Sequence, residues 1–387
     1  MKRGIVFILA STSLITALPA AAVEKNEVEI VNIRIGQGDA TLIRGPADAQ
    51  GKRVTVLFDA GDDQDYDGSR IIAAVLAKRN IRHIEFVVIS HYDADHIGGL
   101  ITERARHGTS FLFGPNGVPG APGDDDNDGR PDWEGQPDQD PDPHELGRGD
   151  DISVGSFVDR GDENNKNTIQ YQRYVKIAAA RGNRFSLDTQ AKLDSFAIDL
   201  GGGARMTPYA SAGRIRDASA KVPKVDTENE QSVSMLVTYG KFDFLVSGDL
   251  IGRDSGSEDA QVERAVGAKI AAAGRIVDVL HVNHHGANNA SDDVFLSQIK
   301  PTIAVISHGD VDQYRHPNVN ALRRLEDAGV YRIIQTKWGT TDVAMSNREI
   351  KDIQAIYQGD VVITSDGADY TVSTSRTYRA DVNPRRR

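Results

Sequence analysis

The chain of 387 residues contains no cysteine, and this absence excludes two kinds of structural element. Disulfide bridges cannot stabilise the fold, and zinc sites built from thiolates cannot form. A transition metal would therefore be bound by histidine, aspartate or glutamate side chains. Zinc, manganese and iron are the ions that such ligands suit, so the sequence favours these metals.

Long apolar runs are also absent beyond the N-terminus, where a bilayer-spanning helix would need about 20 such residues. At the N-terminus, Lys2 and Arg3 precede an apolar stretch over residues 4–18, and small residues follow as far as Ala22. This order is typical of a signal peptide, residues 1–22, that is cleaved after Ala22. A membrane anchor is the alternative, but the apolar stretch is too short. We therefore expect a periplasmic or secreted protein without stable membrane insertion.

Negative charge is concentrated in one segment, although the net charge of the whole chain is −11. Ten acidic residues lie between Asp124 and Glu145, where Arg130 is the one base. The surrounding residues 114–150 also hold seven of the 14 prolines, which predicts an inserted loop without a core of its own. The rest of the chain is close to neutral, so its acidity is weak evidence against an anionic substrate.

This insertion contains carboxylates at the spacing of a calcium loop, at Asp124, Asp126, Asp128 and Asp132, with a glycine between them. The segment departs from an EF-hand because Gly135 stands at the twelfth position and no helix flanks it. It is closer to the short calcium repeats of extracellular proteins. We expect a solvated acidic loop, with a calcium site at these four carboxylates as the alternative.

Strand and helix patterns alternate along the rest of the chain, which predicts an α/β (α+β) fold. The expected strands cover residues 28–35, 41–43, 54–58, 84–89, 233–239, 242–246, 277–282, 303–307, 331–334, 359–364 and 370–373. The expected helices cover residues 69–79, 171–181, 258–273 and 319–328. For the third of these helices, Ser257 is the expected N-cap and Gly274 the expected end.

Histidines and aspartates directly follow four of these strands. They are Asp59, then His91, Asp93, Asp95 and His96, then Asp249, then His284 and His285. Strand ends gather such residues at one edge of a sheet, and the loop of residues 90–99 is short enough to wrap one or two metal ions. Crowded carboxylates also repel one another unless cations neutralise them. The alternative, in which the histidines of the loop only cap a strand, leaves the residues at the other strand ends without a role.

These motifs resemble the metallo-β-lactamase superfamily and, within it, the soluble hydrolase domain of ComEC-type competence proteins. The H-x-H-x-D-H loop of the family is present as His-Tyr-Asp-Ala-Asp-His, in which Asp93 replaces the second histidine, as in ComEC-like members. The matching stretches are residues 31–43, 56–61, 86–100, 229–250, 277–286, 301–309, 314–330 and 359–367. The resemblance implies an αββα sandwich over residues 27–375, with a basic tail at 376–387.

The resemblance also implies a set of ligands for one or two divalent ions, with zinc or manganese expected. One ion would take His91 and Asp93, the second would take Asp95, His96 and one of His284 and His285, and Asp249 would bridge them. Asp59 would not bind an ion directly but would lie behind one of the ligands and orient it. A choice between His284 and His285 is not possible from the sequence.

The third ligand of the first ion is also missing from the sequence pattern. The family often supplies a histidine between the ligand loop and the bridging aspartate. In this chain His107 and His144 are the histidines in that interval, and His144 lies in the acidic insertion. The first site would then be incomplete or completed by water.

The activity implied by the resemblance is that of an exported metal-dependent hydrolase. Metal-activated water would attack phosphorus or carbon, and Asp95 or Asp249 would accept its proton. His316 matches a recurrent His-Pro of the family and would bind substrate or protonate the leaving group, while Arg315 would hold a phosphate. As the alternative, His316 caps the helix that begins near residue 319.

ComEC-type domains are associated with degradation of a DNA strand, so a phosphodiesterase or nuclease acting on single-stranded nucleic acid is the first hypothesis. The chain lacks the basic, aromatic-rich stripe of a non-specific DNA binder. A cell-envelope phosphocholine or teichoic-acid esterase is the second hypothesis, and a lactonase is the third. A non-catalytic extracellular binding protein, stabilised by metal and calcium, is the alternative of another class. The oligomeric state is not predicted.

Overall fold

The computed structural model describes most of the chain from residue 23 onward. The described residues are 5–6, 23–62, 68–101, 110–113, 152–164, 167–223, 225, 227–252, 261–309, 314–337, 354–357, 359–374 and 377–378. The predicted signal peptide apart from residues 5–6, the acidic insertion with Asp124, Asp126, Asp128 and Asp132, and residues 379–387 lie outside this part. His107 and His144 lie outside it as well.

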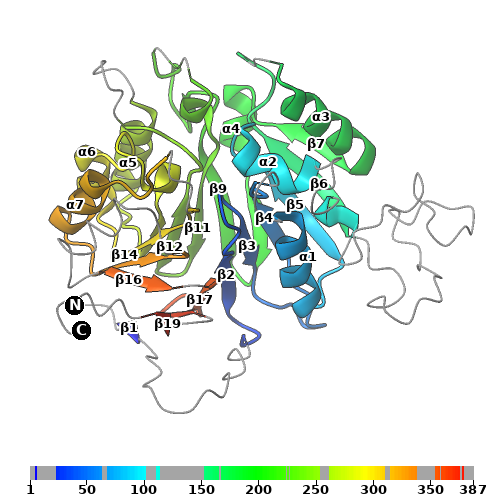
Figure 1. The fold of residues 1–387 in the computed structure, drawn as a ribbon, viewed down its shortest axis with the longest axis horizontal. Coiled ribbons are helices and arrows are strands. Elements are labelled where there is room, and N and C mark those ends of the chain that lie inside the picture. The colour runs from blue at the N-terminus through cyan, green and yellow to red at the C-terminus, as the bar shows by residue number, and fades with distance from the viewer. Residues whose placement is uncertain are drawn as a thin grey trace, which may run out of the picture.

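One mixed sheet is built mainly from the first half of the chain (Figure 1). Its spatial order is β1 (Ile5–Val6), β18 (Tyr370–Thr374), β17 (Val361–Ser365), β2 (Val28–Asn32), β3 (Thr41–Arg44), β4 (Thr55–Phe58), β5 (His83–Val88), β6 (Ser153–Asp159) and β7 (Asn183–Ser186). The strands from β17 through β2 and β3 to β4 pair antiparallel, while β4 to β7 pair parallel. The expected strands over residues 28–35 and 41–43 pair antiparallel as β2 and β3, and those over 359–364 and 370–373 pair antiparallel as β17 and β18.

The second sheet comes mainly from the second half of the chain. Its order is β10 (Arg214–Ile215), β9 (Ala204–Ser211), β11 (Ser234–Tyr239), β12 (Phe242–Val246), β13 (Val279–His281), β14 (Ile303–Ile306), β15 (Arg332–Gln335), β16 (Gln354–Tyr357) and β19 (Thr377–Tyr378), with β8 (Ile198–Gly201) paired to β9. From β12 to β16 the strands run parallel, so their carboxyl ends lie at one edge.

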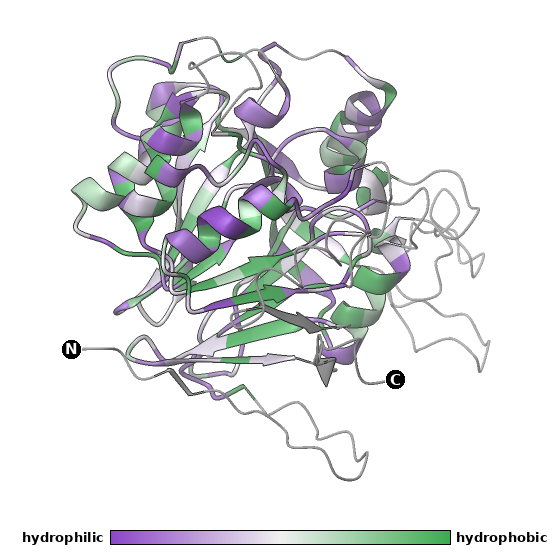
Figure 2. Cartoon of the chain, turned by 60° about the vertical axis from the view of Figure 1, so that its left-hand side comes forward, coloured by the Kyte–Doolittle hydropathy of each residue, from purple (hydrophilic) through white to green (hydrophobic). Residues whose placement is uncertain are grey.

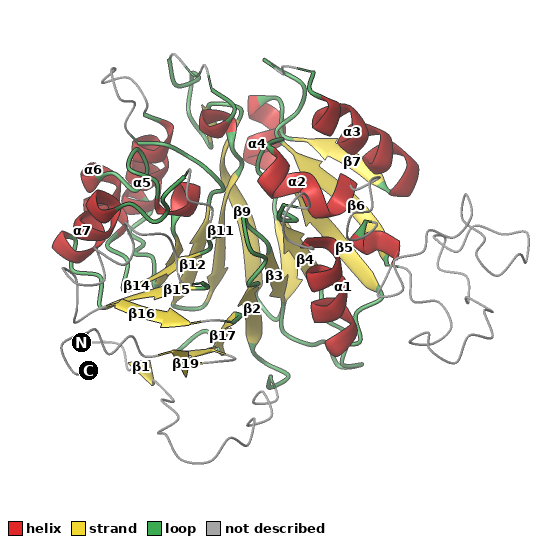
Figure 3. Cartoon of the chain, in the orientation of Figure 1, coloured by secondary structure: helices red, strands yellow, loops and turns green. Residues whose placement is uncertain are grey.

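Helices cover the outer face of each sheet, as Figure 3 shows. On the first sheet pack α1 (Gly68–Lys78), α2 (Ala94–Ile101) and α3 (Ile169–Arg181), and on the second pack α5 (Val262–Ala272), α6 (Asp293–Ile299) and α7 (Val319–Asp327). The short helix α4 (Gln190–Ser195) contacts β9 and β10. Two sheets between two helical layers form the αββα arrangement, so the predicted fold class is confirmed.

Three apolar layers hold this arrangement together, and strand β2 shows how the sequence produces them. Val28 and Ile30 pack between the two sheets, whereas Val31 and Ile33 pack beneath the helices of the first sheet. Alternate residues of a strand point to opposite faces, and both faces are covered here, so every residue of the strand is buried and apolar side chains stand on both faces. Figure 2 shows the same pattern, with hydrophobic strands inside and hydrophilic helix surfaces outside. No helix in the described part of the chain is long and apolar enough to cross a membrane.

Several predicted elements need correction. Helix α5 begins at Val262 after Gln261, not at residue 258, and the expected cap Ser257 lies outside the described residues. The N-cap of α7 is Asn318, whose side chain accepts a hydrogen bond from the backbone of Asn320 at 2.9 Å, so the alternative role of His316 as a helix cap is wrong. The sequence pattern did not predict α2, α4, α6, or the strands β6 to β10.

Gly38 allows the turn between β2 and β3 to lie close to the loop of residues 90–99. Gly38 has φ +93, and a Cβ added to it would lie 1.8 Å from the backbone oxygen of Asp95. Gly51 has a similar φ of +84, but nothing lies within 4 Å of its added Cβ. Both glycines therefore have a positive φ that would strain another residue. Of the two, Gly38 also lies in close contact with backbone from another segment.

We expect Gly51→Ala to lower the free energy of unfolding by about 1 kcal/mol, because alanine is strained at positive φ. Gly38→Ala should cost about 1–3 kcal/mol more, because its methyl group also collides with backbone. Urea unfolding of the two variants and the wild type measures the difference. Equal losses in the two variants would show that the contact between the turns is unimportant for stability.

Candidate metal centre

The candidate metal ligands come from strand ends of both sheets. Asp59 follows β4, and residues 90–96 follow β5 in the first sheet; Asp249 follows β12, and residues 284–285 follow β13 in the second. Each of these two strand pairs is parallel, so the carboxyl ends of its strands lie at the same edge. The structure therefore brings together the four loops that the sequence singled out.

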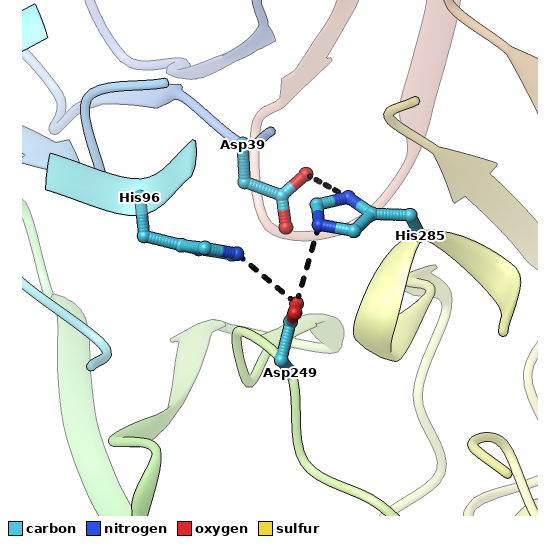
Figure 4. A group of neighbouring side chains, drawn as sticks. All are labelled: Asp39, His96, Asp249 and His285. Atoms are coloured by element: carbon cyan, nitrogen blue, oxygen red, sulfur yellow. Dashed lines mark ion pairs between the residues drawn. The ribbon is translucent and has the colours of Figure 1, made fainter. Parts of the chain in front are cut away.

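Four buried side chains form the centre of this cluster, which Figure 4 shows. Asp39, His96, Asp249 and His285 each offer a ligand atom, and these atoms all lie within 4.8 Å of one another. His96 Nε2 lies 3.2 Å and His285 Nε2 lies 3.5 Å from Asp249 Oδ1. His285 Nε2 is also 3.3 Å from Asp95 Oδ2. Imidazole nitrogens and carboxylate oxygens in this arrangement could bind a divalent metal.

Unpaired buried atoms provide a test of whether a cation fits. Within the described residues, no hydrogen-bond partner is found for Nε2 of His91, His96 and His285, for either oxygen of Asp39, or for Oδ1 of Asp249. Leaving so many buried polar atoms unpaired is costly unless another group satisfies them. One or two cations would satisfy all of them, so the residues fit a metal.

Asp59 determines which nitrogen each histidine of the ligand loop presents. Its Oδ2 accepts hydrogen bonds from His96 Nδ1 at 2.9 Å and from Ser90 Oγ at 2.6 Å. The Ser90 hydroxyl in turn accepts from His91 Nδ1 at 2.9 Å. Because both Nδ1 atoms donate, both Nε2 atoms present lone pairs to the cluster. Asp59 thus lies behind the two histidines, where the resemblance would place it.

The two histidines of the tandem pair differ in burial and in surroundings. His285 is buried, and its Nδ1 donates to the backbone oxygen of Ser307 at 3.0 Å, which leaves the Nε2 lone pair for the cluster. The His284 side chain is 20% exposed, and its Nε2 lies 3.6 Å from Asp249 Oδ2. The structure therefore places His285 in the buried cluster and His284 beside it.

His91 and Asp93 lie on the same side of Asp249 as His284. His91 Nε2 is 3.6 Å from Asp93 Oδ2 and 4.0 Å from Asp249 Oδ2. The Asp93 side chain is 51% exposed, so this part of the cluster opens to solvent. The two oxygens of Asp249 consequently face two different groups of ligand atoms.

The charges of the cluster favour a bound cation. Burial opposes ionisation of His96, but Asp249, Asp95 and Asp59 together raise its pKa well above the usual value. Burial likewise opposes the charge on Asp249, yet the neighbouring histidines hold its pKa well below the usual range. The carboxylates thus stay ionised and attract positive charge, which a proton or a metal ion can supply.

Asp39 was not predicted from the sequence. It lies in the turn between β2 and β3, where its backbone N–H donates to the oxygen of Asp95 at 3.1 Å. Its Oδ1 is 3.5 Å from both His281 Nε2 and His285 Nδ1. An aspartate directly after a glycine is typical of a tight turn, so its local pattern pointed to turn formation. Its position after an apolar strand, shared with the other four loops, was the available signal.

His316 lies beside the cluster but does not enter it. Its ring centroid is 5.7 Å from that of His284 and 6.0 Å from that of His285. Burial lowers the pKa of His316 to about 3, with His285 and His284 acting in the same direction. The preceding Arg315 is exposed. His316 therefore lies next to the partly exposed His284.

A buried carboxylate on α5 binds the side chain of the residue that precedes the tandem histidines. Glu263 accepts from Asn283 Nδ2 at 2.6 Å, from Ser291 N at 2.7 Å and from Asp292 N at 3.0 Å. Asn283 directly precedes His284. Burial raises the pKa of Glu263 to about 7, although these three donors oppose the shift.

Glu263 should make stability depend on pH. Folding raises its pKa from the ordinary 4.5 to about 7, so its contribution to stability is greatest below 4.5 and is lost as pH rises toward 7. We expect the free energy of unfolding of the wild type to fall by about 3 kcal/mol relative to Glu263→Gln over this interval. Urea unfolding at a series of pH values, with metal chelated, measures the change. Parallel pH curves for the two proteins would contradict this role.

Asp59 should control metal affinity through both histidines, and Ser90 through one. Asp59→Asn replaces an acceptor of two hydrogen bonds, so we expect metal affinity to fall by about 10–100-fold. Ser90→Ala releases only His91 and should have a smaller effect. Competition with a chromophoric chelator measures the affinities, with Asp366→Asn in the distal hairpin as the matched control. An unchanged affinity in Asp59→Asn would refute the orienting role.

Comparisons with known proteins agree with this site. A family model described as the metallo-beta-lactamase superfamily matches residues 33–162. ComE operon protein 3 of Bacillus subtilis is 22% identical over 338 residues, which are 84% of this chain and 34% of that protein. Recombination protein 2 of Haemophilus influenzae is 31% identical over 98 residues, which are 25% of this chain and 11% of that protein. The chain thus spans about one third or less of the length of these relatives.

Among solved structures, a metal-dependent hydrolase of the beta-lactamase superfamily aligns with 80% of this chain and 95% of its own, at 11% identity and a TM-score of 0.40. The family model includes Asp39, Asp59 and the whole ligand loop. The αββα layers and the buried histidine and aspartate cluster agree with that match. Over residues 33–162 the chain is similar to the metallo-β-lactamase superfamily, and within that family it resembles the competence proteins of the ComEC type.

Proposed function

We propose that this metallo-β-lactamase-fold hydrolase cleaves phosphodiesters and that single-stranded nucleic acid is its substrate class. The observation that carries the proposal is the pair of ligand groups on the two oxygens of Asp249, next to an open side that includes the half-exposed Asp93. A phosphodiester carries one negative charge, which cations and a guanidinium can hold together. Relatives named for competence and recombination support the nucleic-acid substrate.

Each residue of the cluster has a distinct task in this reaction. A divalent metal, when bound, supplies an activated water and a counter-charge for the phosphate. His91, His96 and His285 would hold it through Nε2, and Asp249 would link the two ligand groups. Asp95 is better placed than Asp249 to accept a proton from water, because its side chain is 25% exposed while that of Asp249 is buried. Gln37 Nε2 donates to Asp95 Oδ2 at 3.2 Å and positions this carboxylate.

His316 fits substrate binding better than protonation of the leaving group. With its pKa lowered to about 3 by burial, its imidazole is neutral at neutral pH. A neutral imidazole can donate one hydrogen bond to a phosphate oxygen but is a poor proton donor to an alkoxide. The guanidinium of Arg315 would supply the charge contact.

Export is part of the same proposal, because residues 1–22 have the composition of a cleaved signal peptide. N-terminal sequencing of protein recovered from the periplasm or the medium tests it. A mature chain that begins at Val23 is the expected result, and a chain that keeps Lys2 in the cytoplasm is the contrary one.

Activity should depend on metal and on the buried ligands. Purified protein should hydrolyse bis-p-nitrophenyl phosphate and single-stranded DNA with manganese or zinc, lose activity with chelator and regain it with metal. His96→Ala and Asp249→Ala should each lower kcat/KM by at least about 100-fold, because metal affinity falls. His83→Ala, at the exposed start of β5, is the matched control and should keep wild-type activity.

A panel of DNA, RNA, envelope phosphodiesters and lactones, each with both metals, identifies the substrate class. Metal-loaded protein that turns over no phosphodiester would contradict the proposal. Turnover of lactones alone would favour a lactonase, and no turnover at all would favour a binding protein.

A further inference from the structure

We propose that the tandem histidines are divided between two metal positions. His285 would complete the buried position, and His284 would be the third protein ligand of an outer position with His91 and Asp93. The inference deepens the proposed function, since it concerns the same metal site. It also assigns a third ligand to the first ion. The sequence had offered His107 and His144 for this role, and both lie outside the described residues.

The backbone sends the two side chains in different directions. His284 and His285 both have left-handed conformations, with φ of 49° and 53°, inside the turn of residues Asn283–Gly286. Non-glycine residues adopt this conformation uncommonly, and two in succession need a fold that compensates for the strain. The two ring centroids lie 6.2 Å apart, with the rings inclined at 66°. The two rings therefore lie at different places beside Asp249.

Asp249 separates the two positions. His285 Nε2 lies 3.5 Å and His96 Nε2 lies 3.2 Å from its Oδ1. His284 Nε2 lies 3.6 Å and His91 Nε2 lies 4.0 Å from its Oδ2. Each carboxylate oxygen thus faces one histidine of the tandem pair and one histidine of the ligand loop.

The spacing of the outer group is that of ligands around an ion. His91 Nε2 is 3.6 Å from Asp93 Oδ2, close to the distances that separate Asp249 Oδ2 from His91 and His284. Two ligand atoms at about 2.1 Å from a tetrahedral metal are about 3.4 Å apart. Among the described residues, the inner group is the one whose ligand atoms all lie within 4.8 Å of one another, so the ligands of the outer group must draw together when an ion binds.

The ligand nitrogen of His284 carries a lone pair. Asn229 Nδ2 lies 3.2 Å from His284 Nε2, and an amide N–H donates to a nitrogen that is not protonated. Asn229 is partly exposed in a short turn, so its amide can move aside when a cation takes the lone pair. His284 Nε2 is thus directed at Asp249 and available.

The two positions should bind metal with unequal affinity. Asp39, His96, Asp249 and His285 are all buried, so the inner ion is shielded from water. The outer position includes Asp93, which is half exposed, and His284, which is partly exposed. An ion at the outer position is less shielded from water than one at the inner position, so it should exchange more easily. It should also lie on the side from which substrate approaches.

Metal stoichiometry without substrate tests this division. We expect the wild type to bind two equivalents of Zn²⁺ or Co²⁺ in calorimetric titrations, one tightly and one weakly. His284→Asn should lose the weak equivalent, with a fall in affinity larger than the roughly 10–100-fold that accompanies loss of an outer partner. Asparagine tolerates the left-handed backbone, and His284→Gly removes its strain altogether, so at least one variant should fold. His285→Asn should lose the tight equivalent instead.

His83→Asn, at the exposed start of β5, is the matched control for loss of a histidine, and it should keep both equivalents. Two equivalents of unchanged affinity in folded His284→Asn and His284→Gly would overturn the inference. A single equivalent in the wild type that His284→Asn retains would overturn it as well. The proposed function can fail separately, because a chain with two ions that cleaves no phosphodiester would leave this division of ligands intact.

Discussion

The buried carboxylate of Asp249 is the group on which the rest of the site depends. Its Oδ1 lies near His96 and His285 and its Oδ2 near His91 and His284, so one side chain connects two groups of ligand atoms. An anionic carboxylate at this depth is stable only among positive charges. The neighbouring histidines lower its pKa for that reason, and a cation in the cluster would have the same effect more strongly.

Both sheets must pack together before this cluster can exist. The first sheet carries Asp39, Asp59 and the ligand loop, whereas the second carries Asp249 and the tandem histidines. Phe58, directly before Asp59, and Val246, three residues before Asp249, lie in the same apolar core between the sheets. The apolar layer thus sets the distance between the two sets of ligands. Removing water from this layer stabilises the fold and positions the metal site at the same time.

Carboxylates behind the cluster orient its ligands from each side. Asp59 directs the histidines of the first sheet, and Glu263 holds Asn283, which precedes the histidines of the second. Neither carboxylate faces the open side of the site. Asp59 was predicted from its position after a strand, since such positions gather at a sheet edge. Glu263 was not, because a glutamate within an amphipathic helix is ordinarily a surface residue, and only its burial against three donors marks it.

The sequence by itself determined the sheet-forming pattern, most of the strands and the residue types that end them, because alternating and continuous apolar runs depend on local periodicity. It also determined that histidine and aspartate, without cysteine, form the ligand set. Only the tertiary structure decided that Asp39 joins the cluster and that His284 and His285 lie on different sides of Asp249. These relations depend on Gly38 approaching the Asp95 backbone and on two successive left-handed residues, which are contacts and conformations that no local periodicity encodes.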